Sequence, residues 1–309
     1  MSRIWLNTIL CPVIFFLGLS SAFGQNGIKV TITDQSDQGL KSIMETNASA
    51  ILTGLNIAFF KNCNPELNAT MLTEKGVKSL LSLWKTTPFR CYESLIIERC
   101  MSRPTEGFEI RNIPLFIKQA KEKDSYEEAN LIFTPDGKID NLLISIDTIL
   151  DKEITKNRNS KTDLQRRTII VDYIENLRTA YMRKDMSKLE EIYGNVELGP
   201  KRIQKQLISD YLDKIRTLFK SNEFISIKFD SIEVVQHQKY LEIYGITIKQ
   251  SLKTSEYSDV SYLFFMLDLK DESNPCVHAC SMQPAFINGK EIDRNEIFSL
   301  GSFGGYGRE

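Results

Sequence analysis

The sequence predicts an α+β protein built from two tandem cone-like domains, each with N-terminal helices packed on a curved antiparallel sheet. Helical periodicity gives way to extended, alternating segments twice along the chain. A polar, charged stretch at 151–165 separates the two runs, and a hairpin signal at 134–138 precedes it. The pattern therefore indicates a first domain at 25–150, a linker at 151–165 and a second domain at 166–300.

Residues 1–24 have the composition of a cleavable export signal. One positive charge precedes an apolar run at 9–19, and Ala22 and Gly24 stand at the positions that an exporting peptidase reads. The run is shorter than the roughly 20 residues that a bilayer-spanning helix needs, and Pro12 interrupts it. We therefore expect an exported protein, periplasmic or secreted, with no transmembrane helix after signal cleavage.

Charge and histidine content exclude several function classes. The 39 Lys and Arg residues are balanced by 40 Asp and Glu residues, so no basic excess is available to bind a phosphate backbone. Nucleic acid is therefore not an expected partner. The chain has only 2 histidines, His237 and His278, which excludes a metal site made of several histidines. We expect no cofactor.

Cysteine number leaves two readings open. Removal of the signal also removes Cys11, and the remaining five cysteines cannot all pair within one chain. Cys91 and Cys100 lie in an apparently extended segment, which places them too far apart to bridge each other. Either Cys63 pairs with one of them, or the thiols are buried and free.

In the first half, the spacing of apolar residues predicts helices at 40–62 and 74–84 with strands before and after them. The strands are expected at 28–33, 92–100, 108–118, 126–133 and 139–146. The stretch 301–309 is rich in glycine and predicts a flexible tail.

The second half repeats this order of elements. Its first helix carries an apolar stripe over 170–181, Asp185 caps a second helix at 186–193, and a third follows at 206–219. Strands are expected at 225–229, 231–237, 241–252, 260–269 and 277–283. A Leu-x-x-Ala-aromatic motif occurs at 55–59 and again at 177–181, which favours two related domains.

The segment 173–193 resembles the nuclear transport factor 2-like superfamily, the cone-shaped fold of the SnoaL-like proteins. The resemblance is carried by Ala180, Tyr181, Asp185 and Leu189, at the passage from the first helix to the second. Later stretches are similar to exported bacterial proteins that are built on this fold and are uncharacterised: 229–234, 244–250, 257–264 and 283–284. The superfamily includes isomerases, dehydratases, hydrolases and modules that only bind, so the resemblance implies a pocket between helix and sheet but no particular activity.

The last strand departs from that pattern. Relatives carry Trp and Arg where this chain has Cys280-Ser281-Met282, which alters the chemistry of any pocket that these residues line. Cys276, His278 and Cys280 share one strand face, as metal ligands would. Positions two apart on a strand are about 6.6 Å apart, however, too far for one metal ion, so core packing is expected and no metal.

Acid–base catalysis has two weak candidates, Asp268 and His278. A carboxylate at the end of the apolar run 262–267 would suit an isomerase or hydrolase if it were buried in a cavity. The charged residues 270–272 that follow instead indicate a strand ending in solvent. A thiol nucleophile activated by His278 is disfavoured because side chains on one strand point in parallel.

The sequence therefore favours a non-enzymatic binding module over an enzyme. The expected ligand is a small apolar molecule or an envelope protein partner, the alternative is a small-molecule isomerase or hydrolase, and oligomerisation is possible. The aromatic and methionine side chains either line a ligand pocket or fill the core. The candidate pocket residues are Tyr173, Tyr181, Tyr244, Tyr262, Phe264 and Met266.

Overall fold

The computed structural model describes most of the chain downstream of the predicted signal. The described residues are 27–103, 106–118, 125–146, 164–194, 201–237 and 240–292. The predicted signal, nearly all of the predicted linker and the predicted tail lie outside them, and the domain boundaries stay a prediction. Among the described helices, none combines the length and apolarity that crossing a membrane requires.

The first half contains two helices and two sheets. Its elements in order are β1 (Lys29–Thr33), α1 (Gln38–Lys61), α2 (Glu74–Thr86), β2 (Phe89–Cys91), β3 (Leu95–Arg99), β4 (Met101–Ser102), β5 (Phe108–Ile117), β6 (Ser125–Phe133) and β7 (Ile139–Ile144). The larger sheet has the order β2-β5-β6-β7, with β4 also paired to β5, and all its pairs are antiparallel. Both helices contact this sheet.

Local side chains set where these helices begin and end. Asp37 caps α1 by accepting a hydrogen bond from the Leu40 N–H at 3.0 Å, and Asn62 ends it with a left-handed φ of 51°. Thr73 caps α2 in the same way, because its hydroxyl accepts from the Gly76 N–H at 3.0 Å.

The pairing of β1 adds a parallel sheet beside the antiparallel one of the first half. β1 and β3 form a separate two-stranded parallel sheet, with Val30 opposite Ile96. Parallel pairing follows from the connection, because the chain passes through α1 and α2 before it returns to β3 in the same direction.

The second half contains three helices followed by a four-stranded antiparallel sheet. Its elements are α4 (Leu164–Met182), α5 (Met186–Gly194), α6 (Lys201–Ser221), β8 (Ile225–Gln236), β9 (Ile243–Thr254), β10 (Ser258–Asp268) and β11 (Cys276–Pro284), with a small hairpin of β12 (Phe286–Ile287) and β13 (Lys290–Glu291). The sheet order is β11-β10-β9-β8. Asp185 caps α5 as expected, accepting from the Lys188 N–H at 3.0 Å.

The expected strands 225–229 and 231–237 are one strand, β8. The register shifts between Phe229 and Ser231, so Asp230 is an extra residue rather than a turn. A second irregularity lies between β10 and β11, next to Met266 and Leu267. Bulges of this kind increase the local twist, and they curl the sheet around the helices.

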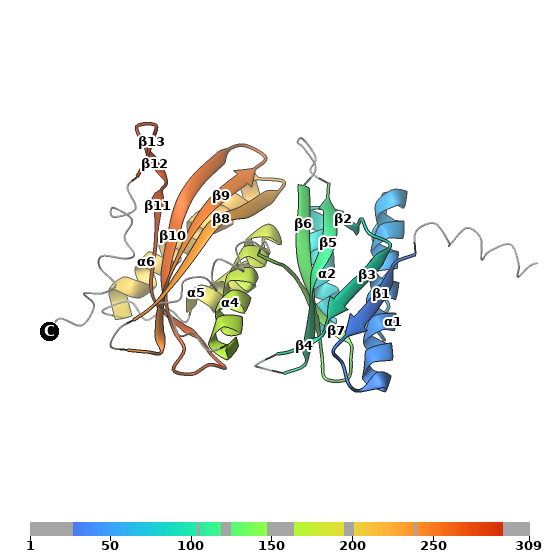
Figure 1. Cartoon of the computed structure of the whole chain (residues 1–309). Helices are drawn as coiled ribbons and strands as arrows, with labels where there is room; N and C mark the ends of the chain where they lie inside the picture. Colours follow the sequence, from blue (N-terminus) through green and yellow to red (C-terminus); the bar gives the residue numbers. More distant parts are fainter. Residues whose placement is uncertain are drawn as a thin grey trace, which may run out of the picture.

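Two buried apolar clusters form the core. One lies between α1, α2 and the sheets of the first half, and the other between α4, α5, α6 and the sheet of the second half. α4 contacts both β7 and β8, and Figure 1 shows it between the two large sheets. Each half thus packs helices on an antiparallel sheet, which confirms the predicted α+β class.

Candidate ligand-binding site

Three tyrosines from three helices meet in the second half. Tyr181 comes from α4, Tyr193 from α5 and Tyr211 from α6. The hydroxyl groups of Tyr181 and Tyr211 are 2.7 Å apart, and those of Tyr193 and Tyr211 are 3.5 Å apart. The rings of Tyr193 and Tyr211 pack edge to face, with centroids separated by 5.2 Å. Tyr211 is therefore the hub of a small hydroxyl cluster.

These tyrosines line a cavity of about 730 Å³ between the helices and the concave face of the sheet. The remaining wall is largely apolar, with Ile215, Leu218 and Leu252 among its members. Polar groups on the sheet side are few, and Gln250 Nε2 donates to Ser261 Oγ at 3.3 Å. The exposed members of the lining mark the mouth, which lies along α6 and the β9–β10 turn: Lys214, Thr217, Ser221, Tyr257, Asp259 and Met282.

Burial keeps the three phenols and the thiol of the wall neutral. Desolvation raises the pKa of Tyr181, of Tyr193 and of Tyr211, so all three phenols hold their protons at neutral pH. Burial also raises the pKa of the Cys280 thiol to about 12. This cysteine is therefore a thiol rather than a nucleophilic thiolate.

The predicted pocket residues on α4 and β9 lie in three different places. Tyr181 lines the cavity. Tyr173 instead packs on Phe265 with ring centroids 5.4 Å apart and borders a separate cavity of about 240 Å³. Tyr244 is fully buried in the core, where its hydroxyl accepts a hydrogen bond from Gln236 Nε2 at 3.1 Å.

The predicted pocket residues of β10 lie on the other face of the sheet. Ser261 lines the cavity and Phe265 belongs to the core beneath the helices, so the alternation of the strand turns Tyr262, Phe264 and Met266 away from it. The Tyr262 hydroxyl donates to Glu291 of β13 at 2.8 Å. These three side chains do not line the tyrosine cavity.

Asp268 and His278 meet at the end of the β10–β11 hairpin. His278 Nε2 lies 2.7 Å from Asp268 Oδ2, and both side chains are partly exposed. The other oxygen of Asp268 accepts from the Lys270 N–H at 2.8 Å, which fixes the turn. Neither residue lines the tyrosine cavity. The geometry is that of a clamp on the hairpin rather than of an acid–base pair facing a ligand.

No disulfide joins the cysteines in the part of the chain that the structure describes. Cys91 and Cys100 are buried, whereas Cys63 is exposed at the end of α1. Burial raises the pKa of both buried thiols. Within the same residues, no group of three or more His, Cys, Asp or Glu side chains is placed to hold a metal ion.

The sequence reasoning missed Tyr193, Tyr211, Gln250 and Ser261. Tyr211 lies within the helix expected at 206–219, but nothing in the sequence places it beside Tyr193. Gln250 and Ser261 are opposite each other on β9 and β10. A polar residue that falls on the buried face of a strand is the one sequence signal that marks both.

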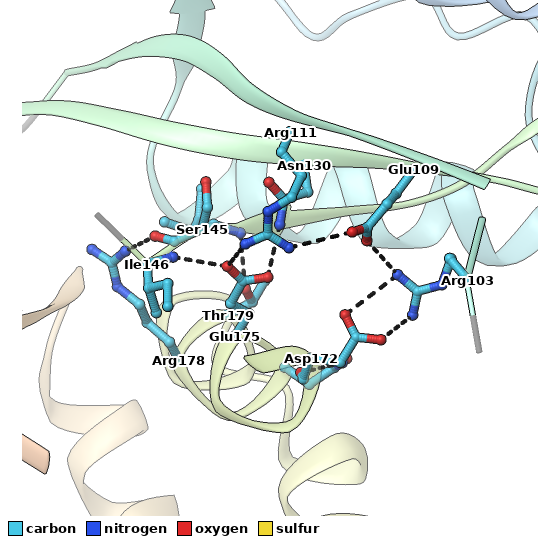
Figure 2. Close-up of polar contacts among 12 residues, drawn as sticks. Arg103, Glu109, Arg111, Asn130, Ser145, Ile146, Asp172, Glu175, Arg178 and Thr179 are labelled. Carbon is cyan, nitrogen blue, oxygen red and sulfur yellow. Dashed lines mark hydrogen bonds and ion pairs between the residues drawn. The ribbon is translucent and has the colours of Figure 1, made fainter. Parts of the chain in front are cut away.

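A second polar feature joins the two halves around α4. The carboxylate of Glu175 accepts hydrogen bonds from Arg111 Nη2 at 2.5 Å, from Asn130 Nδ2 at 2.7 Å and from the Ile146 N–H at 2.9 Å (Figure 2). Burial raises the pKa of Glu175 to about 7, although the neighbouring guanidinium of Arg111 favours the charged form.

Arg103 and Arg178 extend this junction on either side. Arg103 contacts Glu109 at 2.9 Å and Asp172 at 2.5 Å, and burial raises the pKa of Asp172 to about 6. Arg178 donates to the carbonyl oxygen of Ser145 at 2.5 Å in one half and to that of Ile227 at 2.7 Å in the other. Figure 2 shows Asp172 and Glu175 extending from α4 toward the strands of the first half.

Neither a known protein family nor a curated protein sequence matches the chain. Among solved structures, Bd1075 of Bdellovibrio bacteriovorus is similar at 12% identity over 62% of this chain and 75% of that chain, with a TM-score of 0.32. An Ntf2 like protein involved in plasmid conjugation is similar at 11% identity over 72% of this chain and 87% of that chain, with a TM-score of 0.27. At such scores neither similarity carries an argument about function.

Proposed function

We propose that this protein is an exported, non-enzymatic binding protein whose second half holds a small, largely apolar ligand that carries a hydrogen-bond acceptor. The observation behind this proposal is the cluster of three tyrosine hydroxyls at the wall of an otherwise mostly apolar cavity. Two hydrogen bonds among three hydroxyls leave one O–H proton to donate, which suits a carbonyl or ether oxygen on the ligand.

The size and the wall of the cavity support a small molecule as the occupant. A volume of about 730 Å³ lies within the range of roughly 300–1,000 Å³ that small-molecule sites occupy. Burial of the ligand's apolar surface would supply most of the affinity, and the tyrosine hydroxyls would fix its orientation. An envelope protein partner would need a protruding apolar segment to reach the same wall.

The lining offers little for catalysis. It includes no histidine, its thiol at Cys280 stays protonated, and its one acidic member, Asp259, is exposed at the mouth. The contact of His278 with Asp268 is the observation that favours the alternative, a small-molecule isomerase or hydrolase. That pair lies away from the tyrosine cavity, so a binding role is the better supported of the two.

Titration with Nile red, a neutral apolar dye that carries a carbonyl oxygen, tests the proposal. We expect a saturable rise in fluorescence with the wild-type protein. Leu218→Trp should abolish it by filling the cavity. Tyr211→Phe should weaken binding by about tenfold, because it removes the hub of the hydroxyl cluster and a hydrogen bond contributes about 0.5–1.5 kcal/mol.

Tyr262→Phe is the matched control, since it removes the same hydroxyl from the opposite face of the sheet. It should bind the dye like the wild type. Unchanged binding by a folded Leu218→Trp variant would place the dye elsewhere and overturn the proposal.

Export is a separate part of the proposal and needs its own test. Expression of the full chain and of a chain lacking residues 1–24, followed by fractionation of the bacteria, compares the two. We expect only the full chain outside the cytoplasm, shortened at its N-terminus. Retention of the full-length product in the cytoplasm would contradict export.

A further inference from the structure

Arg183, the residue directly after α4, has no carboxylate partner among the described residues. Arg183 Nη1 donates to Asn141 Oδ1 at 3.2 Å, and Nη2 donates to the carbonyl oxygen of Leu142. Its Nε is buried and has no hydrogen-bond acceptor. No carboxylate of the described residues lies within ion-pair distance of this guanidinium, and Asp185 is the acid that acts on it through space.

Burial lowers the pKa of Arg183 only to about 10, so the side chain is charged at neutral pH. A buried charge is costly unless an opposite charge or several hydrogen bonds compensate for it. The contacts with Asn141 and Leu142 compensate in part, and Asp185 acts only through space, so the guanidinium is left without an ion-pair partner.

Arg183 lines a second cavity, of about 900 Å³, between the two halves. One wall is a face of α2 with the adjoining strand β7, and the other consists of the end of α4 and the start of α5. Three groups donate to the amide oxygen of Asn141: Ser79 Oγ at 2.5 Å, the Leu142 N–H at 3.0 Å and Arg183 Nη1 at 3.2 Å. The amide nitrogen of Asn141 is a further donor at this wall.

The cavity is positively charged although the whole chain is nearly neutral. Its lining contains six basic and four acidic side chains, against a net charge of −1 for the chain. Lys75 is paired with Asp140 and Lys188 with Glu191, and Arg103 belongs to the junction described above. Three cations have no carboxylate partner among the described residues: Lys78, Arg183 and Lys184.

We infer that the cleft between the halves is a second binding site, for a small anionic molecule that bears a carboxylate or phosphate group. The anion would face the guanidinium of Arg183, with Lys78 and the Asn141 amide nitrogen as further donors. Guanidinium groups bind such oxyanions through parallel hydrogen bonds, which are stronger than those between neutral groups. The site shares no lining residue with the tyrosine cavity, so it stands independently of the proposed function.

Calorimetric titration of the full chain with citrate and, separately, with inorganic phosphate tests this inference. Sodium chloride at matched ionic strength is the reference. We expect at least one of the two anions to bind at one site, and the stronger of them identifies the preferred head group. Lys78→Ala should weaken binding by about tenfold, because it removes one charge-assisted contact. Lys61→Ala, at an exposed lysine outside the cleft, should leave affinity unchanged.

Asn141→Asp supplies the decisive variant. It places a carboxylate where Arg183 now contacts an amide oxygen, so an internal anion would replace the external one without loss of the fold. We expect this variant to lose binding of citrate and phosphate while melting at or above the wild-type temperature. Heat of binding no greater than the chloride reference for both anions would overturn the inference. So would unchanged affinity in a folded Asn141→Asp protein, or equal weakening by Lys61→Ala.

Discussion

Arg111 of β5 and Glu175 of α4 form a buried ion pair, with 2.5 Å between Nη2 and the carboxylate, that links the first sheet to the first helix of the second half. Glu175 has no exposed surface. Because taking a carboxylate out of water is costly, burial raises its pKa to about 7 even beside an arginine. The junction between the halves is therefore sensitive to pH.

The free energy of unfolding should fall as the pH rises from about 4.5 to 7, because in this range the folded state binds more protons than the unfolded chain. Glu175 has a raised pKa in the folded state, so it is protonated there while the unfolded chain is already ionised, and the effect levels off above pH 7. Asp172, whose pKa is about 6, acts in the same direction. Urea unfolding of the wild type and of Glu175→Gln at several pH values measures this.

In Glu175→Gln the free energy of unfolding should depend less steeply on pH than in the wild type, by up to about 1 kcal/mol per pH unit. The exposed Glu256→Gln is the control and should keep the wild-type slope. Equal slopes in wild type and Glu175→Gln would show that this carboxylate does not titrate in the expected window.

Replacement of Arg178 by methionine should cost about 3–5 kcal/mol of unfolding free energy, the range for breaking a buried charged network. The side chain holds carbonyl oxygens of both halves and pairs with Glu127 at 2.8 Å. Arg216→Ala provides the contrast, because its pairs with Glu190 and Asp213 are exposed to water and should contribute little to the free energy of unfolding. Chemical denaturation of both variants measures the two changes in unfolding free energy. Comparable losses in both would contradict the structural role of Arg178.

Gly76 is required by the close approach of α2 to β7. A Cβ atom at this position would lie 2.3 Å from the carbonyl oxygen of Ile139. Gly76→Ala should therefore destabilise the protein by about 1–3 kcal/mol.

Gly54 is a glycine of α1 with room around it, since its nearest contact would be 3.8 Å away. Gly54→Ala should raise stability by about 0.5–1 kcal/mol through helix propensity and a less flexible unfolded chain. Thermal melts of both variants test the pair, and a shift of the same sign in both would refute the steric argument.

Thiol reactivity should separate the described cysteines. Cys63 is exposed, whereas Cys91 and Cys100 are buried with raised pKa values and Cys280 has a pKa of about 12. Iodoacetamide at neutral pH, followed by peptide mass spectrometry, should label Cys63 first, since only the thiolate reacts. Early labelling of Cys280 would mean that the tyrosine cavity is wetter and its thiol more acidic than the structure implies.

Sequence patterns identify only part of the lining of the tyrosine cavity. Among the predicted pocket residues Tyr181 borders this cavity, since it lies on the inward face of α4 that helical spacing identifies. On β10 the run Tyr262 to Leu267 is apolar throughout, so alternation gave no sign of which residues face the helices. The candidates Tyr262, Phe264 and Met266 occupy the alternate positions of β10 that face away from this cavity.

The approach of His278 to Asp268 was equally hidden. Both residues were singled out, but the contact depends on the irregular pairing of β10 with β11, where Met266 faces Ala279 while Leu267 faces Val277. A bulge of one residue changes the direction of a side chain and leaves little trace in composition.

The amino-acid sequence by itself determined the α+β class and most of the helices and strands, since periodicity, caps and turns act between residues close together in the chain. Only the tertiary structure decided which side chains meet at the two cavities. Tyr181 and Tyr211 are separated by 30 residues, and Arg183 and Asn141 by 42. Such partners are selected by packing between elements, which depends on the shape and burial of every neighbour at once.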